Sequence, residues 1–375
     1  MAITISHASA LHATRLLRSA GAHLASMDRG SIATPQPWMG TRWTKRNFTP
    51  ESWNWHTPSA QSKLHILVKD TAQRVRMSTI RSHTCKAALP PGSIIWLDEN
   101  TTMPCPELLF VQMAETASLP ALVLLGHELC GNFSRFADNP IAGPVTDMLP
   151  AATSVDKLRH YLDTLKQVPG IMKAREAVNH IADHAVSVPE AILATMYALP
   201  PSESGYGMGP ITLNRQIDVT HDLAANIIST RFPDILFPFA PVGINYDGEG
   251  HLDPAGLAKA ARTAERADAQ EKLQAEQALV AKIAEVREKA IDDIRRTREL
   301  AASGFIVFPA TKEDLFEWGQ LDEFTRQILD CAQVVFGADV ATYRERLDDT
   351  ESKRDRFALL SAMLPSANPE HSEVV

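Results

Sequence analysis

The stretch RFPDILFPFAPVGINYDG, at residues 231–248, decides how the C-terminal part of this chain folds. Residues 235–237 and 243–246 are rich in β-prone side chains, and prolines and a glycine lie between or beside them. Short runs of this kind, punctuated by Pro and Gly, are typical of strands that meet in a turn. The stretch therefore predicts two short strands joined by a tight connection.

Three polar side chains lie at the ends of these two strands. Asp234 opens the first strand, and Asn245 and Asp247 are two residues apart near the end of the second. Because alternate residues of a strand point to the same face, we expect the three side chains to gather at one sheet edge. Oxygen ligands at such an edge suit Mg²⁺, which polarises phosphates and activates water. The alternative is structural: Asp before a strand often caps it, and Asp-Gly after a strand often forms a turn.

The composition is that of an ordinary globular protein. At 375 residues the chain has room for two or three domains, and its hydrophobic content of 45% supports buried cores. A formal net charge of −8 argues against a broadly basic surface, although a local basic groove is compatible with it. No zinc-like grouping is formed by the four cysteines, which are Cys85, Cys105, Cys130 and Cys331. With no secretory signal and no apolar run of membrane-spanning length, the sequence indicates a cytoplasmic protein without a membrane partner.

The first half of the chain is predicted to contain three segments. Residues 1–62 hold an N-terminal helix and an irregular Trp/Pro-rich part, whose tryptophans suit either an anchor on a domain or a stacking surface for single-stranded nucleic acid. Residues 63–150 read as a small α+β domain, and residues 151–186 as a helical connector. In that connector His180 and His184 lie four apart, which suits either a metal site or solvated, capping histidines.

Residues 187–340 are predicted to form an α/β domain, and residues 341–375 a charged, disordered tail. The domain begins with the sequence SVPE, a capping box in which Glu190 either caps a helix or joins a metal site. A long helix is expected near residues 255–303, because nearly all of them are helix formers. This helix either packs on the sheet through its C-terminal half or projects as a dimerising arm.

Close to the end of that helix, Asp293 and Arg296 are three residues apart and share one face. An arginine in this setting binds a phosphate through two hydrogen bonds, and the aspartate orients it. The alternative is an ordinary surface ion pair.

The order of these elements resembles the core of the PD-(D/E)XK nuclease superfamily, in particular the branch related to very-short-patch-repair endonucleases. That branch commonly carries Glu-x-Asp-Gly on its second strand, and Asn245 stands here at the position of the Glu. The resemblance implies a restriction-endonuclease-like mixed sheet with flanking helices, preceded by the small α+β domain. The residues that match in order are Glu190, Asp234, Asn245, Asp247, Asp293, Arg296, Leu300 and Gly304.

The same resemblance implies the roles of these residues. Asp234 and Asp247 are expected to ligate Mg²⁺ with help from Glu190. Asn245 lies beside them in the catalytic group. Arg296, oriented by Asp293, is expected to bind the phosphate.

Residues 63–150 are similar to the middle region of AbiEi-type proteins, the abortive-infection antitoxin group of bacterial defence systems. The matching residues are His65, Arg74, His83, Pro106-Glu107-Leu108, Leu124 and Gly126. The winged helix that this group carries at its N-terminus is not evident in the sequence. The resemblance implies a toxin protein as a partner.

Two functions of different classes follow from these patterns. The first is a Mg²⁺-dependent endonuclease that acts on DNA, with a partly degenerate site. The second is a catalytically inactive, antitoxin-type or regulatory module that binds DNA or a protein, and Asn245 favours it because an amide is a weaker ligand than a carboxylate. A third reading, a coiled-coil scaffold, requires the long helix to project.

Overall fold

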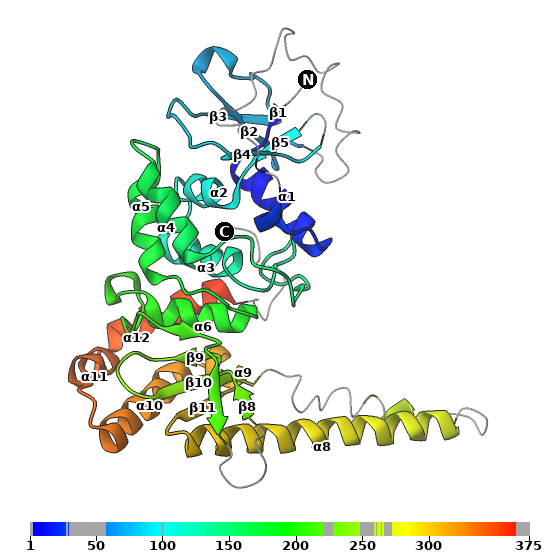
Figure 1. Ribbon diagram of the computed structural model, residues 1–375, viewed down its shortest axis with the longest axis vertical. Coiled ribbons are helices and arrows are strands. Elements are labelled where there is room, and N and C mark those ends of the chain that lie inside the picture. Colours follow the sequence, from blue (N-terminus) through cyan, green and yellow to red (C-terminus); the bar gives the residue numbers. More distant parts are fainter. Residues whose placement is uncertain are drawn as a thin grey trace. The chain divides into compact units, whose positions relative to one another are not determined.

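The computed structural model describes residues 3–27, 29, 58–98, 101–220, 228–247, 259, 261–263, 265 and 272–364. The chain divides into two units, residues 1–210 with 358–375, and residues 211–357 (Figure 1). The sequence predicts that the second domain begins at residue 187. The structure instead groups the helix that carries Glu190 with the first unit, because that helix packs on the helices before it.

Two small sheets lie in the first unit. One has three strands in the order β1–β5–β4, with β1 parallel and β4 antiparallel to β5. The other is a parallel pair formed by β2 and β3. The strands are β1 (Ile3–Thr4), β2 (Leu64–Val68), β3 (Ile80–Thr84), β4 (Ile94–Trp96) and β5 (Thr101–Pro104). Residues 3–4, which lie outside the segment 63–150 predicted as a small α+β domain, pair with β5, and the whole segment belongs to the larger first unit.

The helices of the first unit build its core. Helices α2 and α3 lie at the centre of this core. They are apolar on nearly every side, as expected for helices that are buried all round. Serine side chains start three of the helices by accepting a backbone N–H, namely Ser118, Ser154 and Ser187. The helices are α1 (His7–Ser19), α2 (Pro106–Met113), α3 (Leu119–Leu129), α4 (Val155–Thr164), α5 (Ile171–Ala177) and α6 (Val188–Ala198).

A buried cluster of charges joins α1 to α3. The Glu128 carboxylate accepts hydrogen bonds from Arg15 Nε at 2.9 Å and Nη2 at 2.7 Å, and from Arg135 Nε at 3.0 Å. Arg18 donates to the Glu128 carbonyl at 2.7 Å. Burial alone would raise the pKa of Glu128, but the charges of Arg15 and Arg135 outweigh it and hold the pKa well below its usual range. Glu128 is therefore ionised and fully paired inside the protein.

We expect Glu128→Ala to lower the free energy of unfolding by about 3–5 kcal/mol, because it leaves two buried guanidinium groups without their partner. The pKa of Glu128 is lower in the folded than in the unfolded state. Its contribution is thus complete above the usual carboxyl pKa and is lost as the pH falls through the folded value. Urea unfolding at several pH values measures both effects, with the exposed Glu176→Ala as control. An equal decrease in the free energy of unfolding for Glu128→Ala and Glu176→Ala would contradict the prediction.

The second unit contains a mixed four-stranded sheet in the order β11–β10–β9–β6. Strand β10 pairs antiparallel with β9 and parallel with β11, and β6 pairs antiparallel with β9. A separate hairpin is formed by β7 and β8. The strands are β6 (Thr212–Leu213), β7 (Ile217–Thr220), β8 (Ile228–Arg231), β9 (Ile235–Leu236), β10 (Val242–Tyr246) and β11 (Ile306–Ala310). The α/β class and the two strands predicted from residues 231–248 are confirmed.

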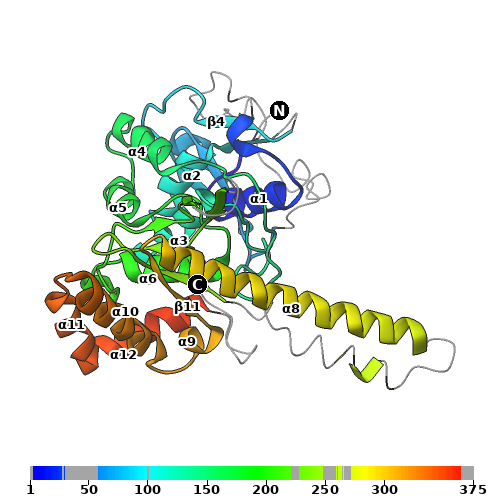
Figure 2. The same cartoon turned by 60° about the horizontal axis from the view of Figure 1, so that its bottom comes forward.

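Helix α8 (Lys272–Ala302) forms most of the connection between the parallel strands β10 and β11. Positions 259, 261–263 and 265 are also helical, and the rest of the predicted 255–271 segment lies outside the described residues. Near its C-terminal end Leu300 is buried against Val307, Leu236 and Ile217. The remainder of α8 extends away from β11 (Figures 1 and 2), and its apolar residues Leu273, Val280, Ile283, Ile291 and Ile294 are exposed. Among the described residues, α8 therefore packs on the sheet through its last turns.

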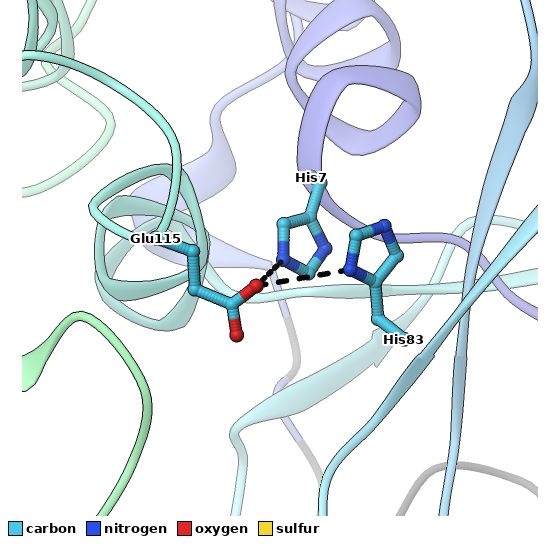
Figure 3. A group of neighbouring side chains, drawn as sticks. All are labelled: His7, His83 and Glu115. Atoms are coloured by element: carbon cyan, nitrogen blue, oxygen red, sulfur yellow. Dashed lines mark hydrogen bonds and ion pairs between the residues drawn. The ribbon is translucent and has the colours of Figure 1, made fainter.

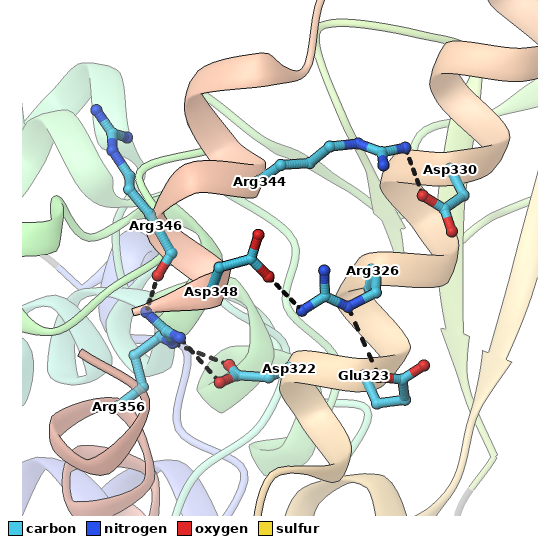
Figure 4. Close-up of polar contacts among 8 residues, drawn as sticks. All are labelled: Asp322, Glu323, Arg326, Asp330, Arg344, Arg346, Asp348 and Arg356. Carbon is cyan, nitrogen blue, oxygen red and sulfur yellow. Dashed lines mark hydrogen bonds and ion pairs between the residues drawn. The ribbon is translucent and has the colours of Figure 1, made fainter. Parts of the chain in front are cut away.

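Residues 341–363 form two helices, where the sequence analysis expects a disordered tail. The last four helices are α9 (Lys312–Phe316), α10 (Gln320–Phe336), α11 (Ala341–Asp348) and α12 (Thr350–Met363). Charged side chains join α10, α11 and α12 (Figure 4): Arg356 binds Asp322 through Nε at 2.9 Å and Nη2 at 2.8 Å, and donates to the Arg346 carbonyl at 3.1 Å. Both Arg356 and Asp322 are buried. The charged composition misled the prediction because these charges pair with α10; residues 365–375 lie outside the described part.

We expect Arg356→Ala to free residues 341–363 from α10, because it leaves the buried carboxylate of Asp322 without its partner. Limited proteolysis followed by mass spectrometry should show faster cleavage in this segment. The exposed Arg354→Ala, two residues away on the same helix, is the matched control. Unchanged cleavage in Arg356→Ala would show that packing alone holds the segment.

Within the described residues, no helix combines the length and the apolar character that crossing a bilayer requires.

Candidate functional site

The β9–β10 hairpin brings Asp234 next to Asn245. The register pairs Ile235 with Ile244, so the residues just outside that pair are Asp234 and Asn245. The Asp234 backbone N–H donates to Asn245 Oδ1 at 3.2 Å, and the Tyr246 N–H donates to Asp234 Oδ2 at 2.6 Å. The predicted gathering of these two side chains at one end of the hairpin is therefore observed.

Asp247 follows β10 directly. Its backbone N–H donates to the Ala310 carbonyl at 2.6 Å, which continues the ladder between β10 and β11. Alternation along the strand places its side chain on the same face as that of Asn245. Asp247 thus lies at the same edge as the predicted group.

Arg296, from the last third of α8, reaches the Asp234 carboxylate. Its Nη2 lies 3.4 Å from Asp234 Oδ1 and also donates to the Phe232 carbonyl. The two side chains are 24% and 13% exposed, so the pair is largely shielded from water. Asp293, one turn earlier on α8, is half-buried, and its carbonyl accepts the Thr297 hydroxyl at 2.9 Å. The structure therefore brings together Asp234, Asn245 and Arg296, as the sequence order suggests.

A second arginine pairs with α8 beside this group. Arg231, at the end of β8, donates through Nε to Glu299 Oε2 at 2.5 Å and lies 3.4 Å from Asp292 Oδ1. The hydrogen bond to Glu299 raises the pKa of Arg231. Both arginines near the hairpin are thus partnered by carboxylates.

The donor set of this group matches Mg²⁺ in type but not in arrangement. Oxygen atoms of Asp234, Asn245 and Asp247 are the kind of ligand that Mg²⁺ prefers. However, Oδ2 of Asp234 and Oδ1 of Asn245 each accept a backbone N–H, and a guanidinium lies beside Oδ1 of Asp234. The cation that neutralises Asp234 in this structure is Arg296, so the residues as arranged do not fit a Mg²⁺ ion on Asp234.

Glu190 belongs to the first unit, where it caps α6. The Ser187 hydroxyl donates to Glu190 Oε1 at 2.9 Å, the Val186 N–H donates to Oε2 at 3.2 Å, and the Glu190 N–H donates back to Ser187 Oγ at 3.4 Å. Glu190 therefore caps α6, with the Val186 N–H as the backbone donor to its carboxylate.

His180, which the sequence pairs with His184 four residues later, contacts the C-terminal end of α6. His180 Nδ1 lies 3.0 Å from the Ala198 carbonyl, and Asp183 between the two histidines accepts the Val155 N–H at 2.8 Å. His180 thus connects its segment to the end of α6, and Asp183 connects it to the start of α4.

One group of potential metal ligands was missed by the sequence analysis. Among the described residues, His7, His83 and Glu115 are the set of three His, Cys, Asp or Glu side chains whose ligand atoms lie within 4.8 Å of one another. Burial lowers the pKa of His7 to about 2 and that of His83 to about 4, with neighbouring histidines adding to the effect. The three residues are far apart in the chain, so no spacing rule reveals them; His83 was noted only as part of a resemblance.

Comparisons with protein-family models, curated proteins and solved structures gave no match to this chain.

We expect Asp234→Ala to lower the free energy of unfolding by about 1–2 kcal/mol, because it removes the acceptor of the Tyr246 N–H and the partner of Arg296. Equilibrium unfolding in urea measures the change. Glu276→Ala, on the exposed surface of α8, serves as control and is expected to change stability by less than about 0.5 kcal/mol. An unchanged free energy of unfolding in Asp234→Ala would show that the Asp234–Arg296 pair contributes nothing to stability.

Proposed function

We propose that the second unit is a nuclease-like module with a regulatory, antitoxin-type binding role and without phosphodiesterase activity of its own. The observation that carries the proposal is the Asp234–Arg296 ion pair. In it, a permanently charged guanidinium lies beside the carboxylate oxygen that a metal ion would need as a ligand. Asn245 supports it further, because an amide at the position of the family Glu supplies no charge to a metal site.

The nuclease-like character of the module rests on the order of its elements. An antiparallel hairpin, a long helix and a strand parallel to the second hairpin strand follow one another as β9, β10, α8 and β11. This order agrees with the restriction-endonuclease-like core that the resemblance implies. The same resemblance implies DNA as a partner. The resemblance of residues 63–150 to AbiEi-type proteins implies a toxin protein as the alternative.

A Mg²⁺-dependent DNA endonuclease is the second candidate function. The proximity of Asp234 and Asn245, with Asp247 on the same strand face, favours it. This function requires Arg296 to leave Asp234, and the released guanidinium would then be available for a phosphate.

Mg²⁺ and Mn²⁺ binding by calorimetry, followed in parallel with plasmid nicking, separates the two functions. We expect neither signal from the wild-type protein. Asn245→Glu combined with Arg296→Met should create metal binding, because it restores a carboxylate and removes the competing cation. Adding Asp234→Ala should abolish that binding.

Arg287→Met, at an exposed position on the same helix, is the matched control for Arg296→Met. Combined with Asn245→Glu, it should not create metal binding. Nicking by the wild-type protein that depends on Mg²⁺ and is lost in Asp234→Ala would establish the endonuclease instead. DNA binding without nicking, weakened by added salt, assigns DNA as the partner of the inactive module. Absence of DNA binding would turn the search toward a toxin protein.

A further inference from the structure

Three side chains from distant parts of the first unit converge beside a cavity (Figure 3). His7 begins α1, His83 lies on β3, and Glu115 follows the end of α2. His7 Nε2 is 3.2 Å and His83 Nδ1 is 3.8 Å from the same carboxylate oxygen, Glu115 Oε2. Because burial keeps both imidazoles neutral, these contacts involve uncharged rings rather than ion pairs.

The distances from Glu115 to the two histidines match those of a ligand set, and all three ligand atoms lie within 4.8 Å of one another. Two ligands held at about 2.1 Å from a tetrahedral Zn²⁺ ion are roughly 3.4 Å apart. The observed separations of 3.2 and 3.8 Å bracket this value. The rings of His7 and His83 are now stacked at 3.5 Å with an interplanar angle of 18°. Ligation in the plane of each ring therefore requires the two rings to tilt apart.

A second layer of contacts orients the histidines. His83 Nε2 lies 3.0 Å from His65 Nδ1, which leaves Nδ1 of His83 as the nitrogen that faces Glu115. The His7 backbone N–H donates to Gln112 Oε1 at 3.1 Å. The contact of His83 Nε2 is the kind that a metal-bound histidine usually makes with its second ring nitrogen, which fixes the ring and the tautomer, whereas the His7 contact holds its backbone.

Two features of His7 show that packing alone does not explain the group. His7 is 3% exposed, and within the described part of the chain its Nδ1 has no hydrogen-bond partner; the same is true of Gln112 Nε2 beside it. The backbone of His7 has a φ of 49°, in the left-handed region that disfavours residues other than glycine. Strain and unsatisfied buried polar atoms together are typical of functional positions.

The cavity leaves one side of the group accessible. Its volume is about 340 Å³, and its lining includes His7, His83 and Glu115. Arg74 and Lys86 also line it with exposed side chains, and the charge of Arg74 is among the causes that lower the pKa of His83. Three protein ligands leave a tetrahedral ion with one further position, which is the pattern of catalytic rather than structural zinc sites.

We propose that His7, His83 and Glu115 bind a divalent transition-metal ion of the Zn²⁺ class, with its remaining coordination position open to the cavity. Two imidazoles and one carboxylate suit Zn²⁺, Fe²⁺ or Co²⁺ and do not suit Mg²⁺, which requires oxygen ligands. The site shares no residue with the Asp234 group. The metal-site proposal does not depend on the function proposed for the second unit.

The test uses the full-length chain, stripped with a chelator and titrated with Zn²⁺ by calorimetry. We expect one ion per chain at this site. Glu115→Gln and His83→Gln should each lower the affinity by about 100-fold or more, and His65→Ala by roughly 10–100-fold, since it acts only through His83. Titration with Co²⁺ gives a second readout, because the visible absorption of the bound ion reports a tetrahedral or five-coordinate environment.

Matched controls are His160→Gln and Glu176→Gln, which change the same residue types at exposed positions of the same unit. Circular dichroism and urea unfolding of each variant show whether it folds. Cys85 also lines the cavity, so Cys85→Ser tests whether a thiolate dominates the binding. Wild-type affinity in Glu115→Gln and His83→Gln, or absence of Zn²⁺ binding by the folded wild type, would overturn the proposal.

Discussion

The register between β9 and β10 is the constraint on which the second unit depends. It sets Asp234 opposite Asn245, and it leaves the Tyr246 N–H aimed at the Asp234 carboxylate. Strand β10 then pairs on its other side with β11, and the connection between them carries α8 back so that Arg296 reaches Asp234. A shift of one residue would turn Asn245 to the opposite face and separate the carboxylate from both of its donors. The local sheet pairing and the ion pair with α8 therefore specify the same arrangement.

Local sequence patterns predicted this part of the fold well. The hairpin, the α/β class and the helical character of residues 272–302 follow from Pro, Gly and β-branched residues and from long runs of helix formers, all of which act over short distances. The tail prediction failed because the charges of residues 341–363 looked like those of a solvated segment. The decisive information was the buried pairing of Arg356 with Asp322, which lies 34 residues earlier and leaves no local trace in the sequence.

The two candidate sites differ in how far the sequence reveals them. Asp234 and Asn245 are 11 residues apart on one hairpin, so strand alternation was enough to bring them together. The role of Arg296 as the partner of Asp234 was harder to foresee, since a phosphate and a carboxylate are equally good partners for a guanidinium. His7 and Glu115 are separated by 108 residues, and their meeting depends on how α1, α2 and β3 pack around the core. Sequence reasoning has no access to such a group without the three-dimensional structure.

The N-terminal strand has a consequence for how the protein is made. Ile3 and Thr4 pair with Thr101 and Thr102. Ile5 is fully buried and forms an antiparallel β-bridge with Ile66 of β2. During synthesis these residues therefore wait for strand partners that are made about 100 residues later. At synthesis rates of roughly 5–20 residues per second, that wait lasts on the order of 5–20 s. Until then the apolar start of the chain has no sheet to join, and contacts of such long range form slowly even afterwards. The pairing of β1 with β5 can form only after β5 has been made, and until then the apolar side chains of residues 3–5 are accessible to aggregation and to chaperones.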